Sequence, residues 1–499
     1  MLTKIIIILF AIYSSVFAQR RETILTYDKY MERIESLIPE MKLTASTESN
    51  AYNDLIRAKS SGDVKFDLQA GAIGTQNYFE QYNVEQYIFL PQSAFRYNGF
   101  RIGAGFSGLI PYSGTRWAVK IQHDGYFGDF DSGNISFPFT PMPGITWRFP
   151  SLRTNNFKYY SPSIKIEITQ PILRDFFGKL DRYPIKDAEY QLTIAKLKRM
   201  IDDNSVLNSY RKLYYQWIMT RKLVSFYNDM IKGAKDFENR AKRGYTNGVI
   251  DNDSYQNAIR QTLKYIEARD EAEIVLKKVL RNIRFFIPET NTIPSERDWN
   301  NTLKNSMNAK IETVPFLESI QGQMAHQLKL RAEYGMTIIK NNSMPDLSIV
   351  GNLSLSALDD NGFFNSFASM TNLNYFVGLM FSYPIGGRDA KAKMMDAYAS
   401  LNAVSADYER VNRDYEIQIG IYYDEFQSYK KMLDIKKREI NAIVSKINTQ
   451  NEKFKQGRIP IDEIINSKLE LAKARAETLN LEYSIIRTVM DYNSLVMME

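Results

Sequence analysis

Cysteine is absent from this chain of 499 residues, and histidine occurs only twice. The lack of cysteine excludes disulfides, thiolate metal sites, cysteine nucleophiles and a lipid-modified N-terminal cysteine. His123 and His326 lie far apart in the sequence and neither has a partner at metal-ligand spacing, so both are interpreted as ordinary core or surface residues. No catalytic constellation and no glycine-rich phosphate loop is found. We therefore expect a protein that is not an enzyme and that needs no metal or other cofactor.

Clusters of basic residues interleaved with aromatic residues are also lacking, although the formal net charge is +7. Nucleic acid is therefore not expected as a partner. Tyrosine (32 residues) and phenylalanine (28 residues) are frequent for a chain whose mean hydropathy is −0.36. This combination indicates polar helices together with strands rich in aromatic residues.

Long apolar runs are missing except at the N-terminus. There Lys4 precedes the apolar stretch Ile5–Tyr13, and Val16–Phe17–Ala18 has the small-residue pattern of a cleavage site. Residues 1–18 are predicted to be a secretory signal peptide, with an N-terminal membrane anchor as the alternative. The stretch is shorter than the roughly 20 residues that span a bilayer. A mature chain of this kind would enter a membrane only as a β-barrel.

Two kinds of segment alternate along the rest of the chain. Helices are predicted over two long proline-free segments and four shorter ones: 185–243 and 388–456, then 26–60, 251–286, 311–342 and 461–497. At 1.5 Å per residue the longest would reach about 100 Å, and two short helices end to end would match one long helix. The last helix carries a heptad pattern of apolar residues from Ile465 to Met490, typical of coiled-coil packing. The alternative is an ordinary amphipathic helix on a globular core.

Strands are predicted in two regions, 63–169 and 346–383. Val64–Ala70, Ile164–Thr169 and Leu347–Ser356 alternate apolar with polar residues, as membrane β-strands do. A soluble sandwich domain is the alternative, and the export signal and long helices favour the membrane. The stretch 75–162 is interpreted as either an enlarged surface loop or additional small strands.

The two halves of the chain resemble each other. A shift of 209 positions places Tyr214 on Tyr423, Trp217 on Phe426, and the turn at 248–253 on that at 457–462. Each half then supplies one principal strand pair, about four strands per chain. Four strands cannot close a barrel in lipid, because open edges would remain. We therefore expect copies of the chain to associate, and three copies would give about 12 strands.

Three features resemble the TolC-type outer-membrane efflux proteins. They are the strand-to-helix junctions at 170–178 and 383–388, the helical turn at 454–464, and the duplicated order of elements. The resemblance covers nearly all of the predicted mature chain. It implies a homotrimer with a β-barrel in the outer membrane and an α-helical barrel crossing the periplasm. It also implies two partners, a periplasmic adaptor (membrane fusion) protein and an inner-membrane pump.

The expected fold class is an α+β membrane protein. A duplicated helix–strand pair–long helix–helix repeat would form a trimeric 12-stranded β-barrel on a long α-helical coiled-coil barrel. The predicted segments are the signal peptide (1–18), an N-terminal helix (19–62), the first barrel strands and surface loop (63–170), the first long helical hairpin (171–286), an equatorial connector (287–310), a helix (311–344), the second barrel strands (345–385) and the second long helical hairpin (386–499).

Candidate functional residues lie at the helical turns and at the junctions. The predicted gate and adaptor-docking tips comprise Gly244, Gly248, Ile250, Asp253, Gly457, Arg458, Ile459 and Asp462, and the predicted junctions comprise Gln170, Pro171, Gly178, Pro384, Gly386 and Gly387. Gly248 and Gly457 are interpreted first as turn residues. Arg458 and Asp462 either latch neighbouring helices or, in the case of the aspartate, cap a helix, and Asp253 has the same two interpretations. In the TolC-type family a second acidic residue often lies one turn further along the helix, and here that place holds Ile465.

The function predicted from these features is a passive exit duct in a tripartite efflux or type I secretion system, gated at its periplasmic tips. A periplasmic coiled-coil scaffold or adaptor is the alternative. A general porin is disfavoured because porins are nearly all strand. Drugs, metals and secreted peptides or proteins all stay open as cargo.

Overall fold

The computed structural model describes residues 23–79, 93–131, 135–138, 146–149, 153–289, 291–456 and 458–497. The predicted signal peptide and Gly457 lie outside these ranges. None of the helices within them carries an apolar stretch long enough to cross a bilayer. The chain divides into two compact units, one made of residues 1–50, 193–327 and 406–499 and the other of residues 51–192 and 328–405.

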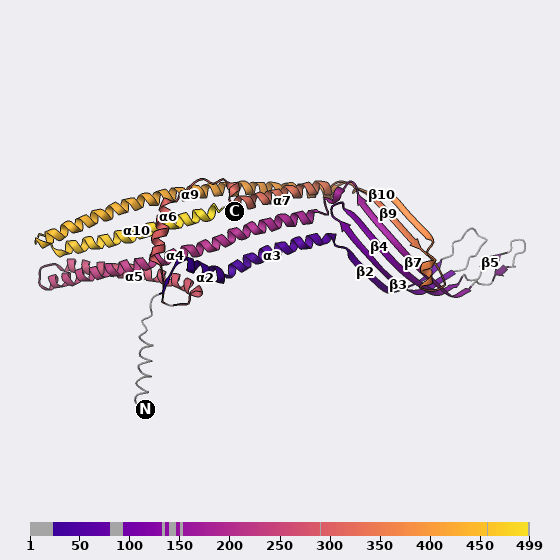
Figure 1. The fold of residues 1–499 in the computed structure, drawn as a ribbon, viewed down its shortest axis with the longest axis horizontal. Coiled ribbons are helices and arrows are strands. Elements are labelled where there is room, and N and C mark those ends of the chain that lie inside the picture. Colours follow the sequence, from indigo (N-terminus) through magenta and orange to yellow (C-terminus); the bar gives the residue numbers. More distant parts are fainter. Residues whose placement is uncertain are drawn as a thin grey trace, which may run out of the picture. The chain divides into compact units, whose positions relative to one another are not determined.

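Two helical hairpins dominate the first unit (Figure 1). One joins α4 (Tyr183–Thr246) to α5 (Asn252–Phe286), and the other joins α9 (Arg388–Lys455) to α10 (Ile461–Leu495). The long helices have no proline beyond the first turn of α4, where its missing N–H would have no intrahelical partner. Met230 and Ala234 of α4 pack against Ile465 and Leu469 of α10, so the heptad pattern of α10 does contact a neighbouring helix.

The largest core of this unit lies where several short elements meet the hairpins. The parallel strands β1 (Thr23–Leu25) and β8 (Thr292–Pro294) pair there, next to α6 (Glu296–Asn308). The buried Tyr214 hydroxyl lies 2.9 Å from the Leu25 carbonyl oxygen and 2.8 Å from a carboxylate oxygen of Asp298. Trp299 is also fully buried, and its indole N–H donates to Glu482 at 3.2 Å. This region fixes the connector between the hairpins.

Two predicted helices are interrupted by proline. The segment 26–60 is not one helix but α2 (Tyr27–Leu37) and α3 (Pro39–Lys59), followed by the 3-10 turn η1 (Ser60–Gly62). The residue before Pro39 is extended because the proline ring excludes a helical conformation there. The segment predicted from Ile311 becomes helical only in α7 (Ile320–Asn342), after Pro315 and the 3-10 turn η3 (Phe316–Glu318).

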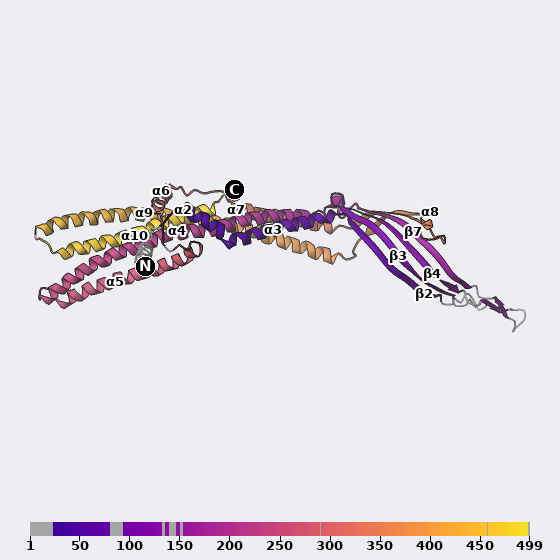
Figure 2. The same ribbon diagram turned by 60° about the horizontal axis from the view of Figure 1, so that its bottom comes forward.

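A six-stranded antiparallel sheet dominates the second unit, in the order β10-β9-β7-β4-β3-β2 (Figures 1 and 2). Its strands are β2 (Lys65–Phe79), β3 (Ser93–Ile110), β4 (Thr115–Asp131), β7 (Arg153–Pro171), β9 (Asp346–Ser356) and β10 (Asn372–Ser382). A separate short hairpin pairs β5 (Ile135–Pro138) with β6 (Thr146–Phe149). A 3-10 turn, η2 (Phe176–Gly178), follows β7 and leads into α4.

The expected number of about four strands per chain is wrong, because β3 and β4 are long members of the same sheet. Together they account for much of the stretch that the sequence left as a loop or small strands. Glycine hides the alternation of side chains in β3, where Gly99, Gly103 and Gly105 occupy one face. A position without a side chain carries no polarity signal, so the pattern of period two is broken in the sequence although the pairing is continuous.

Candidate functional site

The sheet has one apolar and one mostly polar face, although on β10 the second face also carries Phe376 and Met380. In an antiparallel pair, directly opposed residues lie on the same face, so the strand register assigns each side chain to one of two faces. One face, here called the apolar face, carries Phe66, Leu68, Ile102, Phe106, Trp117, Val119, Ile121, Ile164, Ile166, Ile168, Ile349, Leu353, Leu355, Leu373, Tyr375, Val377, Leu379 and Phe381. Many of these side chains are exposed, and Val377 reaches 75%. Exposed apolar side chains over so wide an area indicate a surface that contacts another apolar surface or a membrane.

The opposite, polar face carries charge. On β3 and β4, Arg101 forms a bidentate ion pair with Asp124, with N–O distances of 2.9 and 2.8 Å. Nearer the helices, Lys120 lies 3.4 Å from the Glu167 carboxylate. Lys120 and Glu167 are both about half exposed, whereas the Asp124 carboxylate is buried beneath Arg101. The two faces of the sheet therefore differ in polarity.

The apolar face is covered where it passes beyond β9 and β10. The segment between these strands includes α8 (Asn365–Ala368), which packs on β7 (Figure 2). Phe363 lies over the buried His123, with ring centroids 4.0 Å apart, and His123 Nε2 lies 3.0 Å from the Ser366 hydroxyl. His123 is thus a packed core residue. The uncovered band is about the length of β9 and β10, 11 residues each, which matches the roughly 9–11 residues of a membrane-spanning strand.

The first strand-to-helix junction is held by the predicted residues Gln170 and Gly178. The Gln170 amide donates to the Ser113 carbonyl at 2.9 Å and its oxygen accepts from the Thr115 hydroxyl, which binds the end of β7 to the β3–β4 turn. Gly178 has φ +62, and a Cβ built there would lie 2.0 Å from the Pro111 carbonyl oxygen. Only glycine fits this backbone contact. Pro171 is buried at the end of β7, opposite Ser348.

Backbone conformation is unusual in the same junction. Asp175 and Phe177 both have positive φ, 64 and 53. The Asp175 carboxylate accepts from the Leu180 amide at 2.6 Å, and its own amide donates to Asn341 at 3.1 Å. These bonds hold a conformation that costs roughly 1–3 kcal/mol for a residue with a side chain.

A pair of carboxyl groups adds a pH-dependent element. Burial, together with the hydrogen bond and negative charge of Asp175, raises the pKa of Asp181 to about 6 against the opposing effect of Arg116. Arg116 reaches Asp181 at 3.0 Å and Asp175 at 3.9 Å. The junction is therefore sensitive to protonation in mildly acidic conditions.

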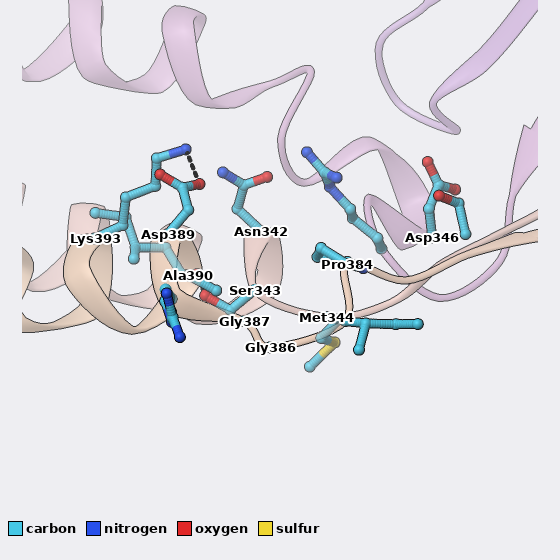
Figure 3. Close-up of a pocket in the computed structure, with 15 residues that line it drawn as sticks. Asn342, Ser343, Met344, Asp346, Pro384, Gly386, Gly387, Asp389, Ala390 and Lys393 are labelled. Carbon is cyan, nitrogen blue, oxygen red and sulfur yellow. Dashed lines mark hydrogen bonds and ion pairs between the residues drawn. The ribbon is translucent and has the colours of Figure 1, made fainter.

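The second junction lines a cavity of about 440 Å³ that also receives Arg174 from the first (Figure 3). Pro384, Gly386 and Gly387 form the loop between β10 and α9, and both glycines have positive φ. Lys393 and Asp389, in the first turns of α9, form an ion pair at 2.7 Å. The structure thus brings the two predicted junctions together around one polar cavity.

The first helical tip is a compact turn. The Val249 amide donates to the Gly244 carbonyl at 2.8 Å, and Gly248 takes φ +70. Ile250 packs back over Gly244, where a Cβ would come 3.3 Å from its side chain. The helix cap is Asp251, whose carboxylate accepts from the Ser254 amide at 2.8 Å.

Asp253 lies in the first turn of α5, and its carboxylate is 3.4 Å from the Asn257 amide. At this tip the capping role considered for Asp253 therefore belongs to Asp251, two residues earlier.

The second helical tip contains Arg458, Ile459 and Asp462, with Pro460 in the cap position of α10. The Arg458 amide donates to the Lys453 carbonyl at 2.9 Å. No ion pair joins the Arg458 and Asp462 side chains of one copy in the part of the chain that the structure describes. One Asp462 carboxylate oxygen is buried without a hydrogen-bond partner there. A latch through these residues would therefore require a neighbouring copy.

No protein-family model matches the chain, and no curated protein matches its sequence. Several solved structures share its fold. The CmeC outer membrane channel of Campylobacter jejuni is 11% identical with a TM-score of 0.60, covering 94% of this chain and 85% of that chain. The MtrE outer membrane channel of Neisseria gonorrhoeae is 10% identical with a TM-score of 0.60, covering 94% and 88%. A membrane protein of Pseudomonas aeruginosa is 8% identical with a TM-score of 0.64, covering 95% and 91%.

These similarities confirm the resemblance to outer-membrane channels at the level of the fold, over nearly the whole chain. Sequence reasoning located the junctions and tips. It missed the Arg101–Asp124 pair, although the alternation through Lys120, Gln122 and Asp124 marks one polar face of β4.

Proposed function

We propose that this chain is the outer-membrane channel component of an efflux or type I secretion system, a passive exit duct and not an enzyme. The observation that carries the proposal is the amphipathic sheet, with its exposed apolar face and two open edges. The similarity of the fold to proteins described as outer membrane channels supports it.

Lipid is the environment that suits the apolar face. The uncovered band spans strands of 11 residues. Leaving this apolar surface in contact with water instead of lipid would cost about 25 cal/mol for each Å². The polar face, with Lys120, Glu167 and the Arg101–Asp124 pair, then borders a water-filled lumen. This is the arrangement of side chains in outer-membrane barrels.

The open edges call for further copies of the chain. Strands β2 and β10 form the two ends of the described sheet, and unpaired backbone groups cannot be left in hydrocarbon. Edge β2 of one copy pairs with edge β10 of the next until the ring closes. We propose a homotrimer, in which segments 63–170 and 345–385 build the barrel and the hairpins of 171–286 and 386–499 build the helical tunnel.

The helical tips form the gate of the duct and its docking site for a periplasmic adaptor, which links it to an inner-membrane pump. The exposed Val249 and Tyr245 side chains near the first tip offer apolar contact area to such a partner. Arg458 and Asp462 act between copies rather than within one copy.

Substitution of neighbouring residues on opposite faces of β9 tests the proposal. Leu353 lies on the apolar face and Ser354 on the polar face. Leu353→Arg places a charge in lipid at a cost of about 2–4 kcal/mol, so the folded protein recovered from outer membranes falls sharply. Ser354→Arg places the same charge in the lumen and leaves recovery unchanged.

The measurement is the amount of folded protein in detergent extracts of outer-membrane fractions, compared with the soluble periplasmic fraction. Equal recovery of both variants from the membrane would contradict a lipid-facing sheet. Recovery of the unmodified chain in the soluble fraction without detergent would favour the alternative, a periplasmic coiled-coil scaffold.

A further inference from the structure

The two halves of the chain differ in one respect inside the sheet. In the second half, β9 and β10 are consecutive and pair directly. In the first half, the corresponding strands β2 and β7 do not pair, because the hairpin β3–β4 lies between them. The chain therefore contains one strand pair more than its internal repeat requires.

From this arrangement we infer that β3–β4 is an additional pair of membrane-spanning strands, so that the ring of three copies closes as an 18-stranded barrel with a wide aqueous bore. The inference rests on the proposed outer-membrane channel. It follows from three copies of a sheet with six strands each.

The side chains of the hairpin continue the two faces of the sheet. On the apolar face, Ile121 is 47% exposed, comparable with 42% for Leu353 of β9. Ile102 and Phe106 of β3 are exposed on the same face. A hairpin that plugged the lumen would have no reason to present such a surface to the same side as β9 and β10.

Pairing along the hairpin is extensive on both sides. β4 pairs with β3 from Thr115 to Asp131 and with β7 from Arg116 to Asp131, with one irregularity near Gly128. The turn between β3 and β4 lies at the first strand-to-helix junction, where it contacts Gln170 and Gly178. Without the hairpin, β2 would have no partner strand in the sheet, and its backbone hydrogen bonds would be lost. The hairpin is therefore not a loop detached from the sheet.

The polar face of β3 adds few side chains to the lumen. Gly99, Gly103 and Gly105 contribute none, and the Arg101 side chain is held against the sheet by its ion pair with Asp124. Barrel diameter grows roughly linearly with strand number, and barrels of 16–18 strands enclose an aqueous channel. Going from 12 to 18 strands therefore widens the barrel about 1.5-fold and its cross-section about twofold.

Single cysteines test the orientation of the hairpin, because the natural chain has none. Ile121→Cys and Lys120→Cys are neighbours on opposite faces of β4, and Leu353→Cys and Ser354→Cys are the matched pair on β9. The purified full-length mature oligomer is placed in liposomes and treated with a charged, membrane-impermeant maleimide. We expect Lys120→Cys and Ser354→Cys to react, and Ile121→Cys and Leu353→Cys to react at least about tenfold more slowly, because a thiolate is disfavoured in hydrocarbon.

The two pairs separate the two possible failures. If the β9 pair behaves as expected but Ile121→Cys reacts as fast as Lys120→Cys, the hairpin is not in the barrel wall and the inference is overturned while the channel stands. If Leu353→Cys is also freely labelled, the proposed channel fails as well. Electron cryomicroscopy of the same sample then counts the strands: 18 continuous strands support the inference, and 12 with the hairpin inside or outside the wall overturn it.

Discussion

Replacing Gly178 by alanine should destabilise the folded protein more than any other single methyl addition at the junctions. The residue has φ +62, and the new Cβ would lie 2.0 Å from the Pro111 carbonyl oxygen and 2.8 Å from the Gly114 nitrogen. The left-handed conformation alone costs an alanine roughly 1–2 kcal/mol. Displacing a backbone turn to relieve the overlap adds about 1–3 kcal/mol. We expect the free energy of unfolding to fall by about 2–5 kcal/mol.

The matched control is Gly387→Ala. Gly387 has φ +53, but no atom lies within 4 Å of a Cβ built there, so only the conformational cost applies. Urea unfolding of the purified mature protein in detergent, followed by circular dichroism, gives the free energy for each variant. Gly178→Ala should unfold at a lower urea concentration than Gly387→Ala. If the two variants agree within about 0.5 kcal/mol, the tight contact between the β3–β4 turn and the junction does not carry the stability assigned to it.

Three further outcomes follow from particular contacts. The raised pKa of Asp181, about 6, means that the folded state binds the proton more tightly than the unfolded state. The free energy of unfolding therefore falls by about 1–2 kcal/mol as pH rises from 4 to 6. Asp181→Asn cannot titrate, so urea titrations at the two pH values should show a smaller difference in its free energy of unfolding. The same difference in the variant and the natural protein would contradict the raised pKa of Asp181. Asp251→Ala removes the cap on the Ser254 amide and should cost about 1 kcal/mol, seen as faster hydrogen exchange in the first turn of α5, whereas Asp251→Asn should exchange like the natural protein. Phe426 is only 2% exposed, so Phe426→Ala should lower the free energy of unfolding by about 3–5 kcal/mol, and Phe426→Leu by much less. Equal melting temperatures for the two variants would refute close packing around Phe426.

The helices were largely predictable because their boundaries depend on local chemistry. The second long helix was expected from Arg388 to Gln456 and is found from Arg388 to Lys455. The errors lie where proline acts within a helical pattern. Pro39 divides a segment whose apolar spacing continues on both sides, and Pro315 delays the start of α7. In both places a single residue overrides the periodicity that predicted the helix.

The sheet was less predictable because its edges and partners are not local properties. β9 shows the alternation of polarity clearly, whereas β10 carries apolar side chains on both faces around Phe376 and the glycines of β3 conceal the pattern. The cover of His123 by Phe363 joins residues 240 positions apart, and no periodicity in the sequence indicates such a contact. At the first tip, helix capping was one of the two interpretations of Asp253, and the cap of α5 is Asp251 instead.

The central claim is that one chain leaves a lipid-facing sheet unfinished and that three chains complete it. The most direct test is the native mass of the signal-free protein extracted from outer membranes, measured after the detergent is stripped in the gas phase. The account predicts a particle of three chains that stays in solution only with detergent. A single chain that remains dissolved in plain buffer would contradict it.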